Sequence, residues 1–315
     1  MKDQKKPEIF GENRYYSLNR YFQNTFGEKV YRLSIDGGFT CPNRDGTVGT
    51  GGCSFCSAGG SGDFAADRIR PISEQLLQAR ELIAGKTANC RKYLAYFQAY
   101  TNTYAGLDEL REKYEQALEP EYIVGMSVAT RPDCLSDEVI GLLTELSKKK
   151  AVYVELGVQT IHERSLQEIG SGFTFSDSRS AIERLHAAGI PVIVHLILGL
   201  PKENRQDMID SVRTVCALPI HGIKLQLLHV LRDTRLAGQY EKKPFDLFEP
   251  EAYADFVIDL LELIPKHVVI YRLTGDGPKK LLLAPLWSGD KKRVLNLIQK
   301  RLRERDTWQA RCCST

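Results

Sequence analysis

Six short apolar segments, rich in β-branched residues, alternate along this chain with longer amphipathic segments. The short segments span residues 30–35, 93–98, 123–128, 153–158, 192–198 and 223–229. The amphipathic segments span residues 74–84, 107–117, 136–148, 177–188 and 204–216. Strands that alternate with helices indicate an α/β fold with a parallel sheet or barrel. Because six units fall short of the eight of a complete barrel, we predict an incomplete (β/α)6 parallel barrel with an open side.

The remaining residues form extensions at both ends of the repeating part. We divide the chain into an N-terminal extension (1–28), a barrel (29–234) and a C-terminal extension (235–315) packed on the barrel. In the last part we expect a helix over 251–264, an added strand over 268–273 and a closing basic helix. Residues 291–311 contain eight Lys or Arg and two acidic residues. Such a segment either binds phosphate groups or is the solvated face of a helix.

Composition narrows the class of protein and the chemistry of its cysteines. A chain of 315 residues, 43% of them hydrophobic, can bury a sizeable core. No apolar run approaches the roughly 20 residues that span a bilayer, and the polar N-terminus leads into no signal-like segment. We therefore expect a cytoplasmic protein with no membrane segment. Disulfides are rare in that compartment, so clustered cysteines are interpreted as metal ligands or catalytic groups.

Three cysteines lie in a glycine-rich loop that follows the first predicted strand: Cys41, Cys53 and Cys56. In barrels the active site gathers at the carboxyl ends of the strands, where this loop falls. Three thiolates can hold a four-iron cluster and leave one iron open. A structural zinc site needs four ligands, yet no His lies within a hundred residues of Cys56 and the nearest other cysteine is Cys90. Zinc and three unrelated buried thiols remain the alternatives.

The spacing Cys-x11-Cys-x2-Cys, with an aromatic residue before the last cysteine, resembles the radical S-adenosylmethionine (SAM) superfamily. Its long first spacer is similar to that of the Elongator catalytic subunit and the YhcC/YtqA-type (MnmL-like) tRNA-modification proteins. Further matching motifs are Cys-Pro-Asn-Arg-Asp-Gly at 41–46, Thr-Arg-Pro-Asp at 130–133, Glu-Leu-Gly-Val-Gln at 155–159, His-x-Ile-x-Gly-Leu-Pro at 195–201 and Leu-Gln-Leu-Leu-His-Val-Leu at 225–231. The resemblance covers residues 15–308 and, for the Elongator subunit, stops at the radical domain.

The resemblance implies a [4Fe-4S] cluster on the three cysteines and SAM on its open iron. Phe55 would then lie against the adenine, unless it is a core aromatic. Gln98 and Asn102 stand where related enzymes carry Gly-Gly-Glu, and offer carbonyl oxygens to the methionine ammonium group. Gln159 flanks the same site. Arg164 can pair with the cofactor carboxylate through a bidentate fork, or is a surface helix arginine.

Other polar residues at strand ends are candidates for a substrate pocket. They are Arg131, Asp133, His195, Gln226, His229, Arg272 and Asp276. For Arg131 and Asp133 an internal salt bridge is the alternative, and for His195 a hydrogen-bonded core role. Because side chains alternate along a strand, Gln226 and His229 face the same side only if the sixth strand bulges.

The family also implies the substrate. The resemblance implies that this chain modifies the wobble uridine of tRNA, converting 5-carboxymethylaminomethyl(-2-thio)uridine to the 5-aminomethyl form through a 5′-deoxyadenosyl radical. The expected partners are tRNA and a low-potential electron donor of the flavodoxin or ferredoxin type. Two alternatives stay open: a radical SAM enzyme acting on a small metabolite or protein side chain, and a non-enzymatic, metal-stabilised RNA-binding protein.

Overall fold

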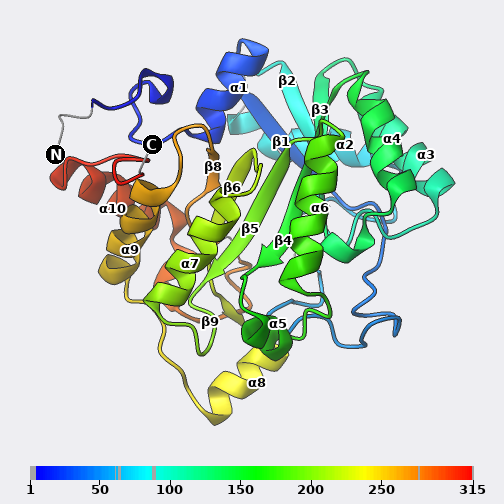
Figure 1. The fold of residues 1–315 in the computed structure, drawn as a ribbon. Helices are drawn as coiled ribbons and strands as arrows, with labels where there is room; N and C mark the ends of the chain where they lie inside the picture. Colours follow the sequence, from blue (N-terminus) through cyan, green and yellow to red (C-terminus); the bar gives the residue numbers. More distant parts are fainter. Residues whose placement is uncertain (1–4, 61, 63–64, 87–89, 276, 314–315) are drawn as a thin grey trace.

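The computed structural model describes residues 5–313 except 61, 63–64, 87–89 and 276. At its centre is a curled sheet of seven parallel strands in the order β1-β2-β3-β4-β5-β6-β8 (Figure 1). The strands span Val30–Ile35 (β1), Lys92–Phe97 (β2), Ile123–Thr130 (β3), Ala151–Gln159 (β4), Val192–Leu198 (β5), Gly222–Leu227 (β6) and Val269–Arg272 (β8). The predicted α/β partial barrel is confirmed, and the strand expected near 268–273 joins its sheet as a seventh member.

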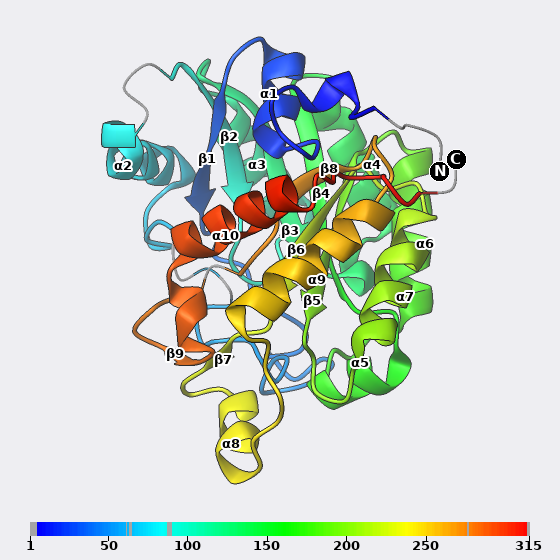
Figure 2. The same ribbon diagram turned by 90° about the vertical axis from the view of Figure 1, so that its left-hand side faces the viewer.

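Helices cover the outer face of this sheet. The α-helices are Leu18–Phe26 (α1), Ile72–Ile83 (α2), Leu107–Leu118 (α3), Asp137–Ser147 (α4), Glu163–Ile169 (α5), Phe175–Ala187 (α6), Arg205–Cys216 (α7), Arg235–Lys242 (α8), Pro250–Leu263 (α9) and Lys291–Glu304 (α10). Short 3-10 helices span Glu8–Phe10, Ala84–Lys86, Pro132–Cys134 and Leu286–Gly289. Helices α2 to α4, α6 and α7 lie against the strands, and α9 packs between α7 and α10 (Figure 2).

Local sequence signals explain where several elements begin and end. The Ser136 hydroxyl accepts a hydrogen bond from the Val139 amide at 3.3 Å and caps α4. Gly189 has a φ of 74° after α6, a left-handed conformation that glycine adopts without steric cost. The next residues, Pro191 included, lead directly into β5. These boundaries match those predicted from the sequence.

The two faces of the strands differ in chemistry. Val152, Val154, Leu156 and Val158 of β4 are buried in the main core against the outer helices. The alternating position Glu155 points to the inside of the barrel, because successive side chains of a strand face opposite sides. The outer face is therefore an ordinary apolar core, and the inner face is free to carry polar groups.

Aromatic residues fill the amino-terminal end of the barrel. Phe10 and Phe22 of the N-terminal extension are buried there beside Tyr153 of β4. The Tyr21 and Tyr153 hydroxyls lie 3.1 Å apart, and the Tyr21 ring centroid is 4.6 Å from that of His221. Helix α1 contacts both edge strands, β1 and β8. These aromatic side chains and helix α1 close this end of the barrel.

A small antiparallel ribbon lies at the carboxyl end, formed by Val230–Leu231 (β7) and Leu282–Ala284 (β9). Helix α8 packs on β7 and projects from the same end (Figure 2). In the described part of the chain, no helix has the length and apolar character needed to cross a membrane.

The buried His221 at this end of the barrel leads to a prediction about how stability depends on pH. Burial lowers the pKa of His221 from its ordinary value of 6.5 to about 4, and its Nε2 has no hydrogen-bond partner among the described residues. In the unfolded chain His221 binds a proton at a higher pH than in the folded protein. The free energy of unfolding therefore decreases as pH falls from 6.5 towards 4, by at most about 1.4 kcal/mol per pH unit for this one proton. His195 carries a similar shift. We expect His221→Phe to make the free energy of unfolding, measured with urea, depend less steeply on pH between pH 4.5 and 6.5, by the contribution of one proton. An unchanged dependence on pH would contradict the lowered pKa of His221.

Candidate active site

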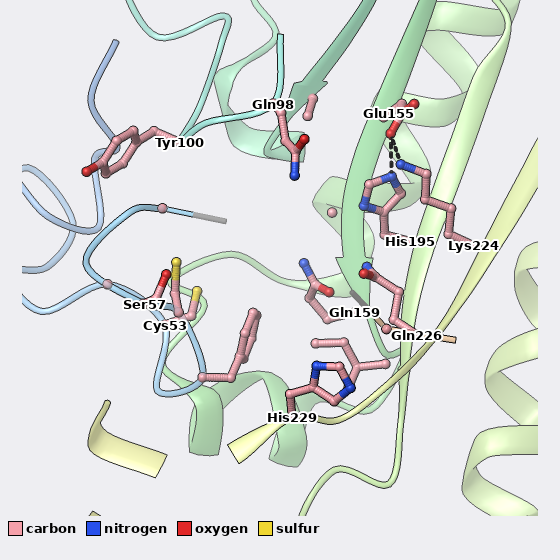
Figure 3. Close-up of a pocket in the computed structure, with 18 of the residues that line it drawn as sticks. Cys53, Ser57, Gln98, Tyr100, Glu155, Gln159, His195, Lys224, Gln226 and His229 are labelled. Atoms are coloured by element: carbon pink, nitrogen blue, oxygen red, sulfur yellow. Dashed lines mark hydrogen bonds and ion pairs between the residues drawn. The ribbon is translucent and has the colours of Figure 1, made fainter. Parts of the chain in front are cut away.

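A cavity of about 240 Å³ opens at the carboxyl ends of the parallel strands. The cysteine loop that follows β1 forms one wall, and the inner faces of β4, β5 and β6 form the opposite wall (Figure 3). Gly275 and Gly277, after β8, contribute to its lining. Side chains from many separate parts of the chain therefore meet at one site.

The three predicted cysteine ligands, Cys41, Cys53 and Cys56, all line this cavity. Among the described residues, no three His, Cys, Asp or Glu side chains converge on a single metal-ion position. A four-iron cluster does not need such convergence, because each thiolate binds its own iron atom. Burial, and then the neighbouring Cys56, raise the pKa of the Cys53 thiol to about 11, so this thiol must lose a proton when it binds metal. The donor set fits a cluster held by three thiolates.

Asn43 fixes the shape of the cysteine loop. Its Nδ2 donates to the Gly170 carbonyl at 2.6 Å and approaches the Cys53 sulfur at 3.5 Å. A Cβ on Gly49 would lie 2.4 Å from the Asn43 side-chain oxygen, so glycine is required for this close approach. A hydrogen bond to a ligand sulfur also tunes the metal that it binds.

Glu155 organises the opposite wall, on the inner face of the barrel. It is fully buried and accepts hydrogen bonds from side chains of four other strands. The donors are Arg32 Nη1 (3.2 Å), Ser127 Oγ (2.9 Å), His195 Nε2 (3.0 Å) and Lys224 Nζ. Lys224 Nζ also lies 3.2 Å from the Tyr96 hydroxyl. One carboxylate thus joins β1, β3, β5 and β6 at the inner end of the cavity.

The protonation states of this network follow from its burial and its charges. Burial favours protonation of Glu155, but Lys224, His195 and Arg32 outweigh it and hold the pKa of Glu155 well below its ordinary value. Burial lowers the pKa of Lys224, Glu155 opposes this effect, and the Arg32 and Arg272 guanidinium groups add to the lowering. Burial and then Lys224 lower the pKa of His195 to about 4. His195 is therefore neutral near pH 7, and an ionised Glu155 assigns the proton to its Nε2.

Most of the predicted site residues meet in this cavity. Phe55, Gln98, Gln159, Arg131, His195, Gln226, His229 and Arg272 line it together with the cysteines. The sixth strand ends at Leu227, so Gln226 lies within it and His229 lies beyond its end. The register of its pairing with β8 shifts between Ile223 and Lys224, before both residues. Because His229 is outside the strand, the alternation of side chains along the strand does not apply to it, and both residues line the cavity.

Three predicted residues lie elsewhere. Asn102 is fully buried, and its Nδ2 donates to the carbonyls of Phe97 (3.2 Å) and Ala129 (2.8 Å), so it ties β2 to β3 beside the cavity. Asp133 forms a bidentate ion pair with Arg131 at 2.7 and 2.9 Å. The internal salt bridge weighed as an alternative for this pair is therefore present.

Arg164 lies outside the cavity on α5. It is exposed and pairs with Asp207 at 2.6 Å. This surface position matches the alternative considered for Arg164. Asp276, the remaining predicted residue, lies outside the described residues.

Gln159 adopts a strained backbone conformation at the end of β4. Its φ is 69°, an uncommon value for a residue with a side chain. The pairing with β5 shifts register between Gly157 and Gln159. A Cβ on Gly157 would lie 2.8 Å from the Gln159 amide nitrogen, so the glycine leaves room for this side chain. Strain of this kind persists where the surroundings impose it and is frequent at ligand sites.

The importance of Lys224, Arg32 and Tyr96 was not predicted from the sequence. The sequence did contain a signal for Lys224. It lies in the strand segment Ile223 to Leu227, in which Gln226 is the other polar residue. A Lys in such a strand requires a buried partner. The partner, Glu155, interrupts β4 in the same way.

The buried Glu155–Lys224 pair leads to a prediction about the energetic coupling between its two members. Removing one member of a buried ion pair costs about 3–5 kcal/mol, whereas replacing both members costs much less. We expect Glu155→Gln to lower the free energy of unfolding by about that amount. We expect the double variant Glu155→Gln/Lys224→Met to cost clearly less than the sum of the two single variants in urea unfolding.

The exposed pair Arg111–Glu145, with two bonds of 2.8 Å, is the matched control. A double-mutant cycle on this pair should give a coupling energy of about 1 kcal/mol or less. Equal coupling energies in the two cycles would contradict the account of Glu155.

Comparison with known proteins places this site in a family. Residues 44–215 match the model of the Radical SAM superfamily, and residues 220–304 match that of the Radical_SAM C-terminal domain. The chain is 44% identical over 300 residues to the uncharacterized protein YtqA of Bacillus subtilis, covering 95% of this chain and 93% of YtqA. It is 38% identical over 263 residues to YhcC of Escherichia coli K12, covering 83% and 84%.

A solved structure shares the fold. The Methanocaldococcus infernus Elp3 with an N-terminal deletion aligns with a TM-score of 0.68 at 16% identity. The alignment covers 89% of this chain and 64% of the Elp3 chain. The family uses a [4Fe-4S] cluster and SAM, which decides between the cluster and zinc interpretations of the cysteine loop. This chain belongs to the radical SAM superfamily, in the Elp3-like group that contains YtqA and YhcC.

Proposed function

We propose that this radical SAM enzyme converts 5-carboxymethylaminomethyl(-2-thio)uridine at the tRNA wobble position to 5-aminomethyl(-2-thio)uridine. The observation that carries the proposal is a cavity lined by the thiols of Cys41, Cys53 and Cys56 and, on its inner wall, by Arg272 and the Glu155–Lys224 pair. This arrangement supports radical chemistry beside a guanidinium group that attracts a negatively charged substrate. We propose a cytoplasmic location and an electron donor of the flavodoxin or ferredoxin type.

Relatives support tRNA as the substrate class. A M. infernus protein named tRNA uridine(34) acetyltransferase is 25% identical over 218 residues, covering 65% of this chain and 40% of that protein. Elongator complex protein 3 of Schizosaccharomyces pombe is 26% identical over 256 residues, covering 76% and 45%. The match covers less than half of each of these longer proteins.

The basic helix α10 supports a contact with RNA over part of its length. Arg301 lies 3.8 Å from Asp255 of α9, and Arg305, just after α10, pairs with Asp259 at 2.8 Å. Lys292 and Arg293 are exposed in the first turn of α10. This turn follows β9 of the ribbon and the 3-10 helix Leu286–Gly289 in the chain. We propose that this first turn, rather than the whole helix, binds phosphate groups.

We propose that residues 29–234 hold the cofactors and that the C-terminal extension closes the substrate pocket. Cys41, Cys53 and Cys56 would hold the cluster. Phe55, Gln98 and Gln159 would contact SAM. When bound, the cluster and SAM supply a 5′-deoxyadenosyl radical.

The substrate reaction balances without a further oxidant. A hydrogen atom leaves the methylene between the amine and the carboxylate. Loss of the amine proton, and of one electron that would return to the cluster that had donated an electron to SAM, gives an imine. Water adds to the imine, and the aminomethyl nucleoside and glyoxylate separate. His195, which lines the cavity and is neutral near pH 7, can hydrogen-bond that water.

The test is conversion of tRNA by the reconstituted enzyme. With SAM and a reductant, nucleoside mass spectrometry should show the carboxymethylaminomethyl nucleoside disappearing and the aminomethyl nucleoside appearing. Cys41→Ala, Cys53→Ala and Cys56→Ala should each abolish the conversion and the cleavage of SAM, because each removes a cluster ligand.

Persistence of the carboxymethylaminomethyl nucleoside while SAM is cleaved would contradict the proposed substrate. It would favour a small metabolite or a protein side chain. Full SAM cleavage in any of the three cysteine variants would contradict the ligand assignment.

A further inference from the structure

The inner end of the cavity contains more positive than negative side chains. Glu155, Lys224 and Arg272 line it, from β4, β6 and β8, and a fourth charged residue, Arg32 of β1, lies 3.2 Å from Glu155. Glu155 is the only carboxylate of this set, and it is already bonded to Arg32 and Lys224. The charge of Arg272 is therefore not balanced by Glu155.

Arg272 has a polar but uncharged neighbour. Its Nη1 donates to the Gln226 side-chain oxygen at 3.3 Å. Among the residues that the structure describes, no carboxylate lies within ion-pair distance of the Arg272 guanidinium. By contrast, Arg131, also in the cavity, is neutralised by its bidentate pair with Asp133. A half-buried guanidinium without a counter-ion favours an anionic ligand.

The position of Arg272 limits which anion can reach it. Gln226 lies across the cavity from Cys53 and the cysteine loop (Figure 3), so Arg272 is on the side away from the cluster ligands. A backbone phosphate of RNA has a sugar on each side, so the polynucleotide would have to enter and leave the inner end of the cavity to bring a phosphate to Arg272. A carboxylate at the end of a slender side chain can reach Arg272 with only one connection to the nucleoside.

We infer that Arg272, with Gln226 beside it, binds the carboxylate of the substrate and so selects the carboxymethylaminomethyl side chain. The inference rests on the proposed function, because it takes this cavity as the substrate site. A planar guanidinium can bind both carboxylate oxygens through parallel hydrogen bonds. The product, which lacks the carboxylate, loses this interaction and leaves more readily.

The test compares two anticodon stem-loop RNAs, one with the carboxymethylaminomethyl group and one with the aminomethyl group. Binding to the cluster-loaded enzyme is measured with saturating SAM and without reductant, so that the cofactor's own carboxylate site is filled and no turnover occurs. The wild-type enzyme should bind the carboxylate-bearing RNA roughly tenfold or more tightly, as expected for a charge-assisted bond. Arg272→Gln should bind both RNAs equally, at about the wild-type Kd for the aminomethyl RNA.

Lys280→Gln is the matched control, because it removes one positive charge from an exposed position after β8. Any effect on phosphate attraction should change both Kd values by the same factor and leave their ratio unchanged. A wild-type ratio near one overturns the carboxylate site while leaving tRNA as the substrate. A ratio that survives in Arg272→Gln also overturns it.

Failure of both RNAs to bind would contradict the proposed function instead. In that case N-methylglycine, the end of the predicted side chain, tests the site directly. A rise in the Tm of the wild-type enzyme with N-methylglycine, lost in Arg272→Gln and absent with dimethylamine, supports the site. No rise overturns it.

Discussion

The buried carboxylate of Glu155 is the interaction on which the inside of this barrel depends. It accepts hydrogen bonds from β1, β3, β5 and β6, and so connects strands that are distant in the sequence. A buried charge is costly unless it is paired and hydrogen-bonded. Each of these strands must therefore keep its register for the carboxylate to remain satisfied. The same requirement fixes the side chains that form the inner end of the cavity.

The barrel separates stability from chemistry by the faces of its strands. Outward residues such as Val154 and Leu156 pack against helices in the main core, whereas the inward neighbour Glu155 is part of the polar network. Along the inside, aromatic residues such as Phe22 and Tyr153 close the amino-terminal end, and the cysteine loop borders the other end. A ligand that enters between the loop and the network contacts the cysteine thiols on one side and the polar network on the other.

The sequence was sufficient for the features that depend on local pattern. Strand β5 has its predicted bounds, and Ser136 and Gly189 mark the helix ends as expected. The glycine-rich spacing of the cysteines placed them correctly at one cavity. Features that depend on pairing between strands were harder to predict. Lys224 and Glu155 are 69 residues apart, so only the register of three strands brings them together. Arg164 was misplaced because its helix, α5, begins beyond the end of β4 and directs it to Asp207.

The central claim is that radical chemistry in this cavity acts on the methylene beside the substrate carboxylate. The most direct test uses tRNA in which the hydrogens of that methylene are replaced by deuterium. After reaction with the reconstituted enzyme, SAM and reductant, mass spectrometry of the 5′-deoxyadenosine should show deuterium transferred from the tRNA. If 5′-deoxyadenosine forms from SAM in the presence of this tRNA but contains no deuterium, the claim is wrong.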